Sequence, residues 1–217
     1  MEKKEWCNVP LTPEAIERMN DVLELYARPC DAREPVICID EKTKQLVEDV
    51  VPSRLPTPGR EARVDYHYRR KGTANIFLSV EPKGGTRVTR VTKRKTSADF
   101  ASFFVHALAQ YPAAVKVHVV MDNYKTHLEG ALRKHLGHSH PVFSKVVFHY
   151  TPKRGSWLNQ AEIELGVMGA QCLDKRIGSM QVLDEEVSAW TNERNDARAT
   201  ITWTFTKEDA KRVFKIE

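Results

Sequence analysis

The spacing of apolar side chains marks the start of the chain as a helix followed by a strand. Apolar residues from Ile16 to Tyr26 recur at helical spacing behind a Thr-Pro start, which predicts an amphipathic helix over residues 12–28. The run PVICID, residues 35–40, is short, rich in β-branched side chains and ends on Asp40. This is the pattern of a buried strand that carries a polar group at its carboxyl end.

Apolar patterns typical of helices and of strands continue to alternate along the rest of the chain. A stretch with three prolines and one glycine, residues 52–59, interrupts these patterns and is predicted to form an extended loop. We expect strands at residues 74–82, 86–95, 115–123 and 146–152, with a hairpin turn between the first two, and helices at residues 97–111, 126–136, 156–174, 183–194 and 207–214. A hairpin followed by strand and helix units is a mixed α/β layout with right-handed crossovers.

Composition narrows the class of protein. The 217 residues suffice for one main domain and are too few for two comfortable ones. No apolar run approaches the length that a bilayer needs, and no apolar stretch follows the charged start, so the default location is cytoplasmic. The net charge of +5 favours a polyanionic partner, although an excess of this size is also common in proteins that bind nothing acidic. The four cysteines form no C-x-x-C pair and are expected to be reduced thiols, two of them on core faces.

Two of the expected strands end on a carboxylate, Asp40 and Asp122. Ligands of open α/β sheets collect at the carboxyl ends of strands, so these acids meet if their strands are neighbours. Each aspartate also has an ordinary explanation, because Asp at a strand end is often a turn former or a helix cap. The pair is therefore a candidate site only if a further group joins it.

The helix expected at residues 156–174 offers two glutamates as that further group. Its apolar stripe includes Leu158 and Leu165, and Glu162 falls within this stripe whereas Glu164 points away. A glutamate on the sheet-facing side of a helix is costly unless it is paired or bound to a metal, which selects Glu162. The alternative is that Glu162 complements the helix dipole with its tip exposed.

Three converging carboxylates would repel one another unless a divalent cation neutralised them. Hard oxygen ligands of this kind suit Mg²⁺ or Mn²⁺. Two such ions in one site can activate an attacking water or 3′-hydroxyl and stabilise the leaving oxygen of a phosphodiester.

Three blocks of the sequence carry a resemblance to a known family. CIDEK (38–42), VVMDNYKTH (119–127) and FHYTPKRGSWLNQAEIE (148–164) closely resemble the signature blocks of DDE transposases of the bacterial insertion-sequence 630 type, relatives of the mariner elements. Flanking phrases such as RKGTANIFLSVEP and WTFTKEDA agree as well, so the resemblance covers nearly the whole chain.

The resemblance implies an RNase H-like α/β fold, with a mixed five-stranded sheet flanked by helices, an N-terminal helix and a helical C-terminal tail. It divides the chain into a helical lead-in (1–34), a catalytic core (35–176) and a C-terminal extension (177–217). The family's acids map onto Asp40, Asp122 and Glu162, which would be both the catalytic residues and the ligands of two Mg²⁺ ions, with Mn²⁺ as a substitute. Such an enzyme hydrolyses phosphodiesters at the ends of a mobile element and joins the freed 3′-hydroxyls to target DNA.

Other residues of the blocks are candidates for supporting roles. His127 could orient the second aspartate or touch the substrate, and it could equally be an ordinary side chain in a first helical turn. A group of three histidines between residues 135 and 140 lacks an acidic or cysteine partner, and we interpret it as surface histidines. The supporting and DNA-contacting candidates are Lys42, Asn123, His127, Lys153, Arg54, Arg60, Arg69 and Arg70. For the lysines and arginines the alternative is a solvated surface side chain, and for Asn123 it is a turn residue.

The implied partners are double-stranded DNA, as element terminal repeats and as target, and a second copy of the chain assembled on that DNA. Full-length relatives carry helix-turn-helix modules before the core, and this chain begins just upstream of the core. We therefore expect a catalytic half with a separate DNA-binding partner, or a truncated remnant, in a bacterial nucleoid-associated setting without a membrane. Two alternatives stay open, namely a non-transposing RNase H-like nuclease and a domesticated copy that binds DNA or a partner without cutting.

Overall fold

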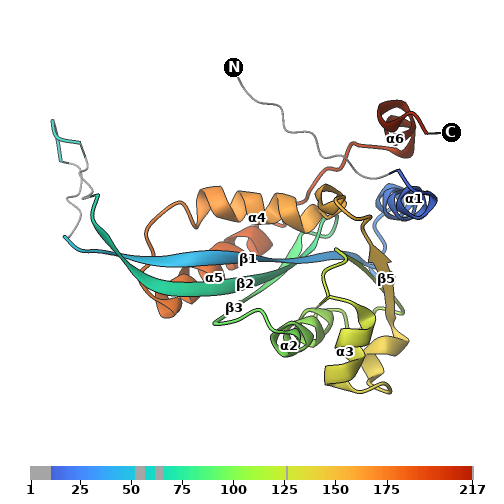
Figure 1. Cartoon of the computed structure of the whole chain (residues 1–217), viewed down its shortest axis with the longest axis horizontal. Coiled ribbons are helices and arrows are strands. Elements are labelled where there is room, and N and C mark those ends of the chain that lie inside the picture. The colour runs from blue at the N-terminus through green and yellow to red at the C-terminus, as the bar shows by residue number, and fades with distance from the viewer. Residues whose placement is uncertain (1–10, 52–56, 62–65, 126, 217) are drawn as a thin grey trace.

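The computed structural model describes residues 11–51, 57–61, 66–125 and 127–216, and it is built around one mixed sheet (Figure 1). The strands lie in the order β3-β2-β1-β4-β5. The β1–β2 and β2–β3 pairs are antiparallel, whereas β1–β4 and β4–β5 are parallel. The strands are β1 (Val36–Asp49), β2 (Tyr68–Glu81), β3 (Thr86–Thr92), β4 (Val117–Met121) and β5 (Val146–Tyr150). The predicted hairpin and parallel crossovers are confirmed.

Helices cover both faces of the sheet, so the core has two layers (Figure 1). Cys38 and Leu78 face the layer of α1, α4 and α5, while Ile39 and Phe77 face the layer of α2, because successive residues of a strand point to opposite faces. The helices are α1 (Pro13–Ala27), α2 (Ser97–Leu108), α3 (Glu129–Leu136), α4 (Gln160–Gln171), α5 (Met180–Asp196) and α6 (Lys207–Phe214). Within the described chain, no helix is long and apolar enough to cross a bilayer.

Strand β1 is much longer than its apolar run suggests. The sequence predicts an end at Asp40, but the strand continues to Asp49 through antiparallel pairing with β2, in which Asp40 lies opposite Leu78. The prediction was wrong because the second half of β1 is polar and half-exposed, so only its pairing identifies it as a strand. Together β1 and β2 form an arm that projects beyond the helical layers (Figure 1).

The C-terminal tail packs against helix α1 and against the turn that precedes α4. Trp203 and Phe205 precede α6, and their rings contact Trp157, with centroids 6.3 and 5.3 Å away. Trp203 also contacts Tyr26 of α1, at 5.3 Å. The tail therefore holds α1 and the turn before α4 together. The helix predicted at residues 207–214 is confirmed at those bounds.

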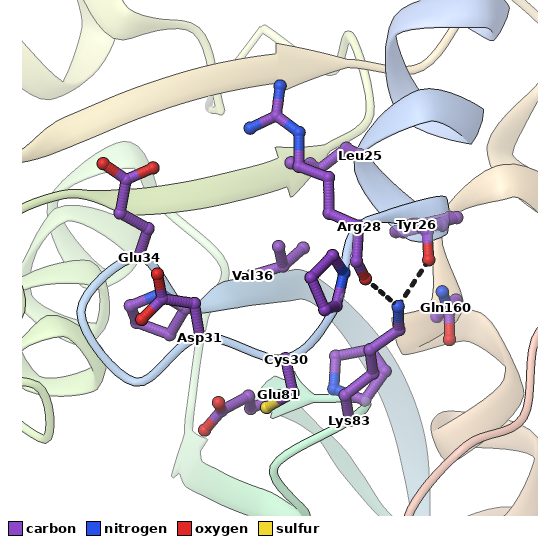
Figure 2. Close-up of a pocket in the computed structure, with 13 residues that line it drawn as sticks. Leu25, Tyr26, Arg28, Cys30, Asp31, Glu34, Val36, Glu81, Lys83 and Gln160 are labelled. Atoms are coloured by element: carbon purple, nitrogen blue, oxygen red, sulfur yellow. Dashed lines mark hydrogen bonds between the residues drawn. The ribbon is translucent and has the colours of Figure 1, made fainter.

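A small pocket at the joint between α1 and the β2–β3 turn is structural in character (Figure 2). The ammonium group of Lys83, which lines this pocket, donates hydrogen bonds to the carbonyl oxygen of Tyr26, at 2.7 Å, and to that of Arg28. These bonds satisfy carbonyl groups at the end of α1 that have no partner within the helix. The cavity volume of the pocket is about 30 Å³, which is room for at least one water molecule.

The cysteine prediction also holds among the described residues. Cys38 and Cys172 are buried and Cys30 is exposed, and all three are free thiols. Cys7 lies outside the described residues.

Candidate active site

Asp40 is a buried carboxylate in the middle of β1, on the face covered by α4. The backbone N–H of Glu41 donates to its Oδ1 at 2.8 Å. The side-chain amide of Asn159 donates to its Oδ2 at 3.2 Å and to the carbonyl of Ile39 at 2.9 Å. These contacts fix the orientation of Asp40 from both of its oxygens.

Asn159 also starts helix α4, so one residue links the helix to the acid. Its Oδ1 accepts a hydrogen bond from the N–H of Ala161 at 3.2 Å, which is the N-cap arrangement that Asn favours. The turn before it is a 3₁₀ helix, Ser156–Leu158, and its carbonyl at Leu158 accepts from the hydroxyl of Tyr26 at 2.7 Å. Sequence reasoning missed Asn159, although an Asn directly before an amphipathic helix is an available signal.

The choice between the two glutamates of α4 rested on wrong geometry. The helix begins at Gln160 rather than Ser156, and Leu158 belongs to the 3₁₀ turn, so a spacing of four from Leu158 does not place Glu162 on the buried stripe. Glu164 is the buried glutamate, and Glu162 is exposed. The stripe argument therefore fails.

Glu164 is instead part of a structural ion cluster. Its Oε1 lies 2.6 Å from Nε of Arg87 on β3 and 3.0 Å from Nε of Arg194 on α5. Burial by itself raises the pKa of Glu164, but the hydrogen bonds from the two arginines outweigh it and lower the pKa below the ordinary value. This glutamate is ionised and paired, and it has no group left for chemistry.

Glu162 nevertheless lies in the same electrostatic neighbourhood as the two aspartates. Burial is the largest cause that raises the pKa of Asp40 to about 7, and the negative charges of Glu162, Asp122 and Glu41 contribute to the same rise, against the hydrogen bond from the Glu41 backbone. The charges of the two other predicted acids therefore act on Asp40, together with that of Glu41, which the sequence did not suggest.

Asp122 follows β4 directly, as predicted, and a buried histidine holds it. Nδ1 of His127 lies 2.5 Å from Oδ1 of Asp122, and the N–H of Tyr124 donates to the same oxygen at 3.0 Å. Nε2 of His127 lies 2.8 Å from Oε2 of Glu41. His127 is 1% exposed, so the role of orienting the second aspartate fits it, and a surface side chain does not.

These contacts set the charges of the pair. Burial disfavours the charged ring, but hydrogen bonds to Asp122 and Glu41 prevail and raise the pKa of His127 to about 9. Burial likewise opposes ionisation of Asp122, but its hydrogen bond with His127 lowers the pKa of this aspartate below the ordinary value. At neutral pH the two groups form an imidazolium–carboxylate pair.

The acids fit a divalent cation in their chemistry. Carboxylate oxygens are the donors that Mg²⁺ and Mn²⁺ prefer, and a buried acid with a pKa near 7 among like charges is a group that such a cation would neutralise. Among the described residues, however, no group of three or more His, Cys, Asp or Glu side chains is arranged to hold one ion. The assignment of Asp40, Asp122 and Glu162 as metal ligands therefore stays a prediction.

A groove lies beside Asp122, between α1 and the loops that follow β4 and β5. It encloses about 440 Å³, and Arg18, Asn123 and Lys153 are among its lining residues. The side chain of Asn123 accepts from Arg18 and donates to the carbonyl of Thr151, so it is a fixed spacer between α1 and β5 rather than a free turn residue. Arg18 is a groove residue that the sequence did not suggest, because its place depends on how α1 packs.

The remaining basic candidates lie elsewhere. Nζ of Lys42 lies beside Gly169 of α4, where a Cβ on that glycine would approach it to 3.4 Å. Arg69 and Arg70 are exposed on the arm, opposite Glu48 and Val47, which is about 25 Å along β1 from Asp40 at the usual rise per residue. Arg60 is also exposed and forms an isolated antiparallel bridge with Thr57, and Arg54 lies outside the described residues.

The three histidines near residue 138 form no metal-ligand group with other described residues. His135 and His138 are exposed, and Nδ1 of His140 accepts from the N–H of Val142 at 3.3 Å. Their interpretation as surface histidines agrees with these positions.

Sheet order and layers define the class of protein: a mixed five-stranded sheet with helices on both faces, in an RNase H-like fold. The chain belongs to the DDE superfamily endonucleases, whose family model matches residues 35–184. A search of curated protein sequences finds no match.

Among solved structures, transposase complexes resemble the chain. The Mos1 mariner paired-end complex with Mn has a TM-score of 0.62 at 16% identity, over 92% of this chain and 61% of that one. The Mos1 strand transfer complex has a TM-score of 0.60 at 15% identity, over 92% of this chain and 60% of the other. At these identities the likeness establishes the fold, and this chain spans about three fifths of the length of the Mos1 chains it matches.

Proposed function

We propose that the chain is the catalytic domain of a DNA transposase of the insertion-sequence 630 type. The carrying observation is the gathering of Asp40, Asp122 and Glu162 in one electrostatic neighbourhood at the centre of a DDE endonuclease fold, with the pKa of Asp40 raised to about 7 by burial and by its acidic neighbours. The Mos1 structures, solved as paired-end and strand transfer complexes, support DNA ends as the substrate.

In the proposed reaction a water oxygen attacks the phosphorus at an element end, and the bond to the 3′-oxygen breaks to leave a 3′-hydroxyl. That hydroxyl then attacks a phosphodiester of target DNA, forms a new P–O bond and displaces the target's 3′-oxygen, which takes up a proton. A bound Mg²⁺ or Mn²⁺ would supply acidity to the attacking oxygen and charge neutralisation to the phosphate.

The chain's own residues account for the holding and orienting parts of this reaction. Asp40, Asp122 and Glu162 would hold the metal, with Asp40 fixed by Asn159 and Asp122 fixed by His127. Arg18 and Lys153 line the groove beside Asp122 and would contact the DNA backbone there. Joining two element ends requires two active sites in one assembly, so we propose that the chain works as a dimer on DNA, together with a separate end-recognition module.

The test is a cleavage assay with the purified chain, Mg²⁺ or Mn²⁺, and DNA that carries the element's terminal repeats. Cleavage at the ends that disappears in Asp122→Asn supports the proposal. Random nicking that disappears in the same variant points to a non-transposing nuclease, and binding without metal-dependent cleavage points to a domesticated DNA-binding copy. Glu186→Gln on α5, which removes one acid from a surface ion pair with Lys175, is the matched control and should cleave like the wild type.

A further inference from the structure

Glu41 is an acid at the site that the metal-binding triad does not use. It follows Asp40 in β1, and because neighbouring residues of a strand point to opposite faces, its side chain lies on the α2 side of the sheet. Only 9% of the side chain is exposed. Its Oε2 lies 2.8 Å from Nε2 of His127, and its Oε1 lies 3.5 Å from Nζ of Lys95.

His127 connects Glu41 to the second aspartate across a single ring. The imidazole packs on Phe100 of α2, with ring centroids 4.3 Å apart, and Tyr124 contacts it edge-on at 5.8 Å. Nδ1 of the ring hydrogen-bonds Oδ1 of Asp122 at 2.5 Å, and Nε2 lies 2.8 Å from Oε2 of Glu41, within ion-pair distance but without the geometry of a hydrogen bond. The ring can neither flip nor tilt without losing one of these contacts.

The consequence falls on the orientation of Asp122. Its Oδ1 takes both the His127 contact and the N–H of Tyr124, which leaves Oδ2 as the oxygen available for a further bond. In metal sites, carboxylates outside the ligand shell orient the groups that bind the metal. Glu41 would act in the same way, because it contacts His127, which in turn contacts Asp122. Side chains whose rotamers are locked in this way bind a cation without first losing conformational freedom.

We propose that Glu41 is a positioning residue, which acts through His127 to hold Asp122 in the orientation that binds the divalent cation. The proposal rests on the proposed function above. Glu41 itself does not touch the cation, because it lies on the opposite face of β1 from Asp40. Lys95, in the segment after β3, contacts the other carboxylate oxygen of Glu41.

The test measures Mn²⁺ affinity by electron paramagnetic resonance on the full chain without DNA, in wild type, Glu41→Gln, His127→Gln and the double variant. Glu41→Gln should weaken Mn²⁺ binding by about 10 to 100 fold. Since Glu41 acts through His127, the double variant should bind no more weakly than His127→Gln alone. The control Glu186→Gln should bind like the wild type.

Two results would overturn the proposal: unchanged Mn²⁺ affinity in Glu41→Gln, or additive losses in the double variant, which would make Glu41 a direct ligand. At saturating Mn²⁺ the cleavage rate of Glu41→Gln should recover to within a few fold of the wild type, whereas loss of a ligand would not be rescued.

A metal-free measurement keeps the proposal separate from the function it rests on. NMR of the His127 ring should show signals in Glu41→Gln that are shifted from those of the wild type, because the variant removes the carboxylate 2.8 Å from Nε2. If the wild type binds no Mn²⁺ and cleaves no DNA but these signals shift as expected, the proposed function fails and the Glu41 contact stands. If Glu41→Gln does not fold, Glu41→Asp, which keeps the charge and shortens the reach, replaces it and should shift the same signals.

Discussion

Two charge clusters among the described residues, one buried and one partly exposed, differ in their balance. In one, Glu164 is met by the guanidinium groups of Arg87 and Arg194, so positive charge outweighs negative. In the other, Asp40, Asp122, Glu162 and Glu41 share a neighbourhood with His127 and Lys95, so negative charge outweighs positive. The first cluster ties α4 to β3 and α5 without any further group. In the proposed function, a divalent cation would balance the second.

The two glutamates of α4 illustrate this difference within one turn of helix. They are two residues apart and therefore point in different directions, Glu164 into the layer of α5 and Glu162 outward near Asp40. A buried acid is therefore not by itself a sign of catalysis, since complete pairing makes it structural. The acid proposed to be functional, Glu162, has no comparable pair of arginines around it among the described residues.

The largest expected effect is a difference in unfolding free energy between variants of these two glutamates. Glu164→Gln should lower the free energy of unfolding by about 3–5 kcal/mol, because Arg87 would remain buried without its counter-charge. Glu162→Gln should change it by less than about 0.5 kcal/mol, as expected for an exposed position. Urea unfolding followed by circular dichroism measures both. Equal losses in the two variants would remove the distinction between a structural and a functional cluster.

The second prediction concerns the pH dependence that the uncompensated cluster imposes. The folded pKa of Asp40, about 7, lies above its unfolded value of about 3.9, so the native state binds more protons between these two pH values. Ionising Asp40 therefore lowers stability as the pH rises from about 4 to 7, by about 4 kcal/mol at most. Asp40→Asn removes this dependence.

The measurement is the difference in unfolding free energy between Asp40→Asn and the wild type at pH 4, 6 and 8. This difference in unfolding free energy should become more favourable to the variant as the pH rises, whichever of the two proteins is more stable at pH 4. Adding Mg²⁺ at pH 8 should raise the melting temperature of the wild type and leave that of the variant unchanged. A difference that stays flat with pH would mean that the charge at Asp40 is already compensated.

The sequence predicted the features that depend on local pattern. Thr12 with Pro13 marks the start of α1, the KGG turn joins β2 to β3, and Asp122 stands at the end of β4. These signals rest on capping, turn chemistry and apolar runs, all of which are visible within a few residues. The three blocks also predicted Asp40, Asp122 and Glu162 as the acids of the site, which stays a prediction.

The features that the sequence did not predict depend on contacts between distant residues. Helical spacing favoured Glu162 for burial because the 3₁₀ turn before α4 has no clear local signal, and because the partners of Glu164 come from β3 and α5. The pairing of Glu41 with His127 spans two elements on the α2 face in the same way. Element type is a local property, whereas the partner that makes a buried charge tolerable is a tertiary one.

The third prediction concerns the packing that supports the start of α4. Trp203→Ala should lower the free energy of unfolding by about 2 kcal/mol, less than a fully buried Trp would, because its ring is only partly covered where it meets Tyr26 and Trp157. Val213→Ala, an exposed position on α6, is the control and should have little effect. Thermal unfolding of both variants tests this. If Trp203→Ala melts like the control, the tail does not hold the turn before Asn159.

The smallest effect distinguishes the groove beside the acids from the distant arm. Lys153→Gln and Arg69→Gln should each reduce the salt dependence of DNA binding by about one unit of slope if both contact phosphates. Lys153 lines the groove next to Asp122, whereas Arg69 lies about 25 Å from Asp40 along β1. Only Lys153→Gln should therefore also slow cleavage at saturating DNA. If Arg69→Gln slowed cleavage equally, the arm would have to reach an active site. The positive charge that balances the acidic cluster would then have to come from a second copy of the chain.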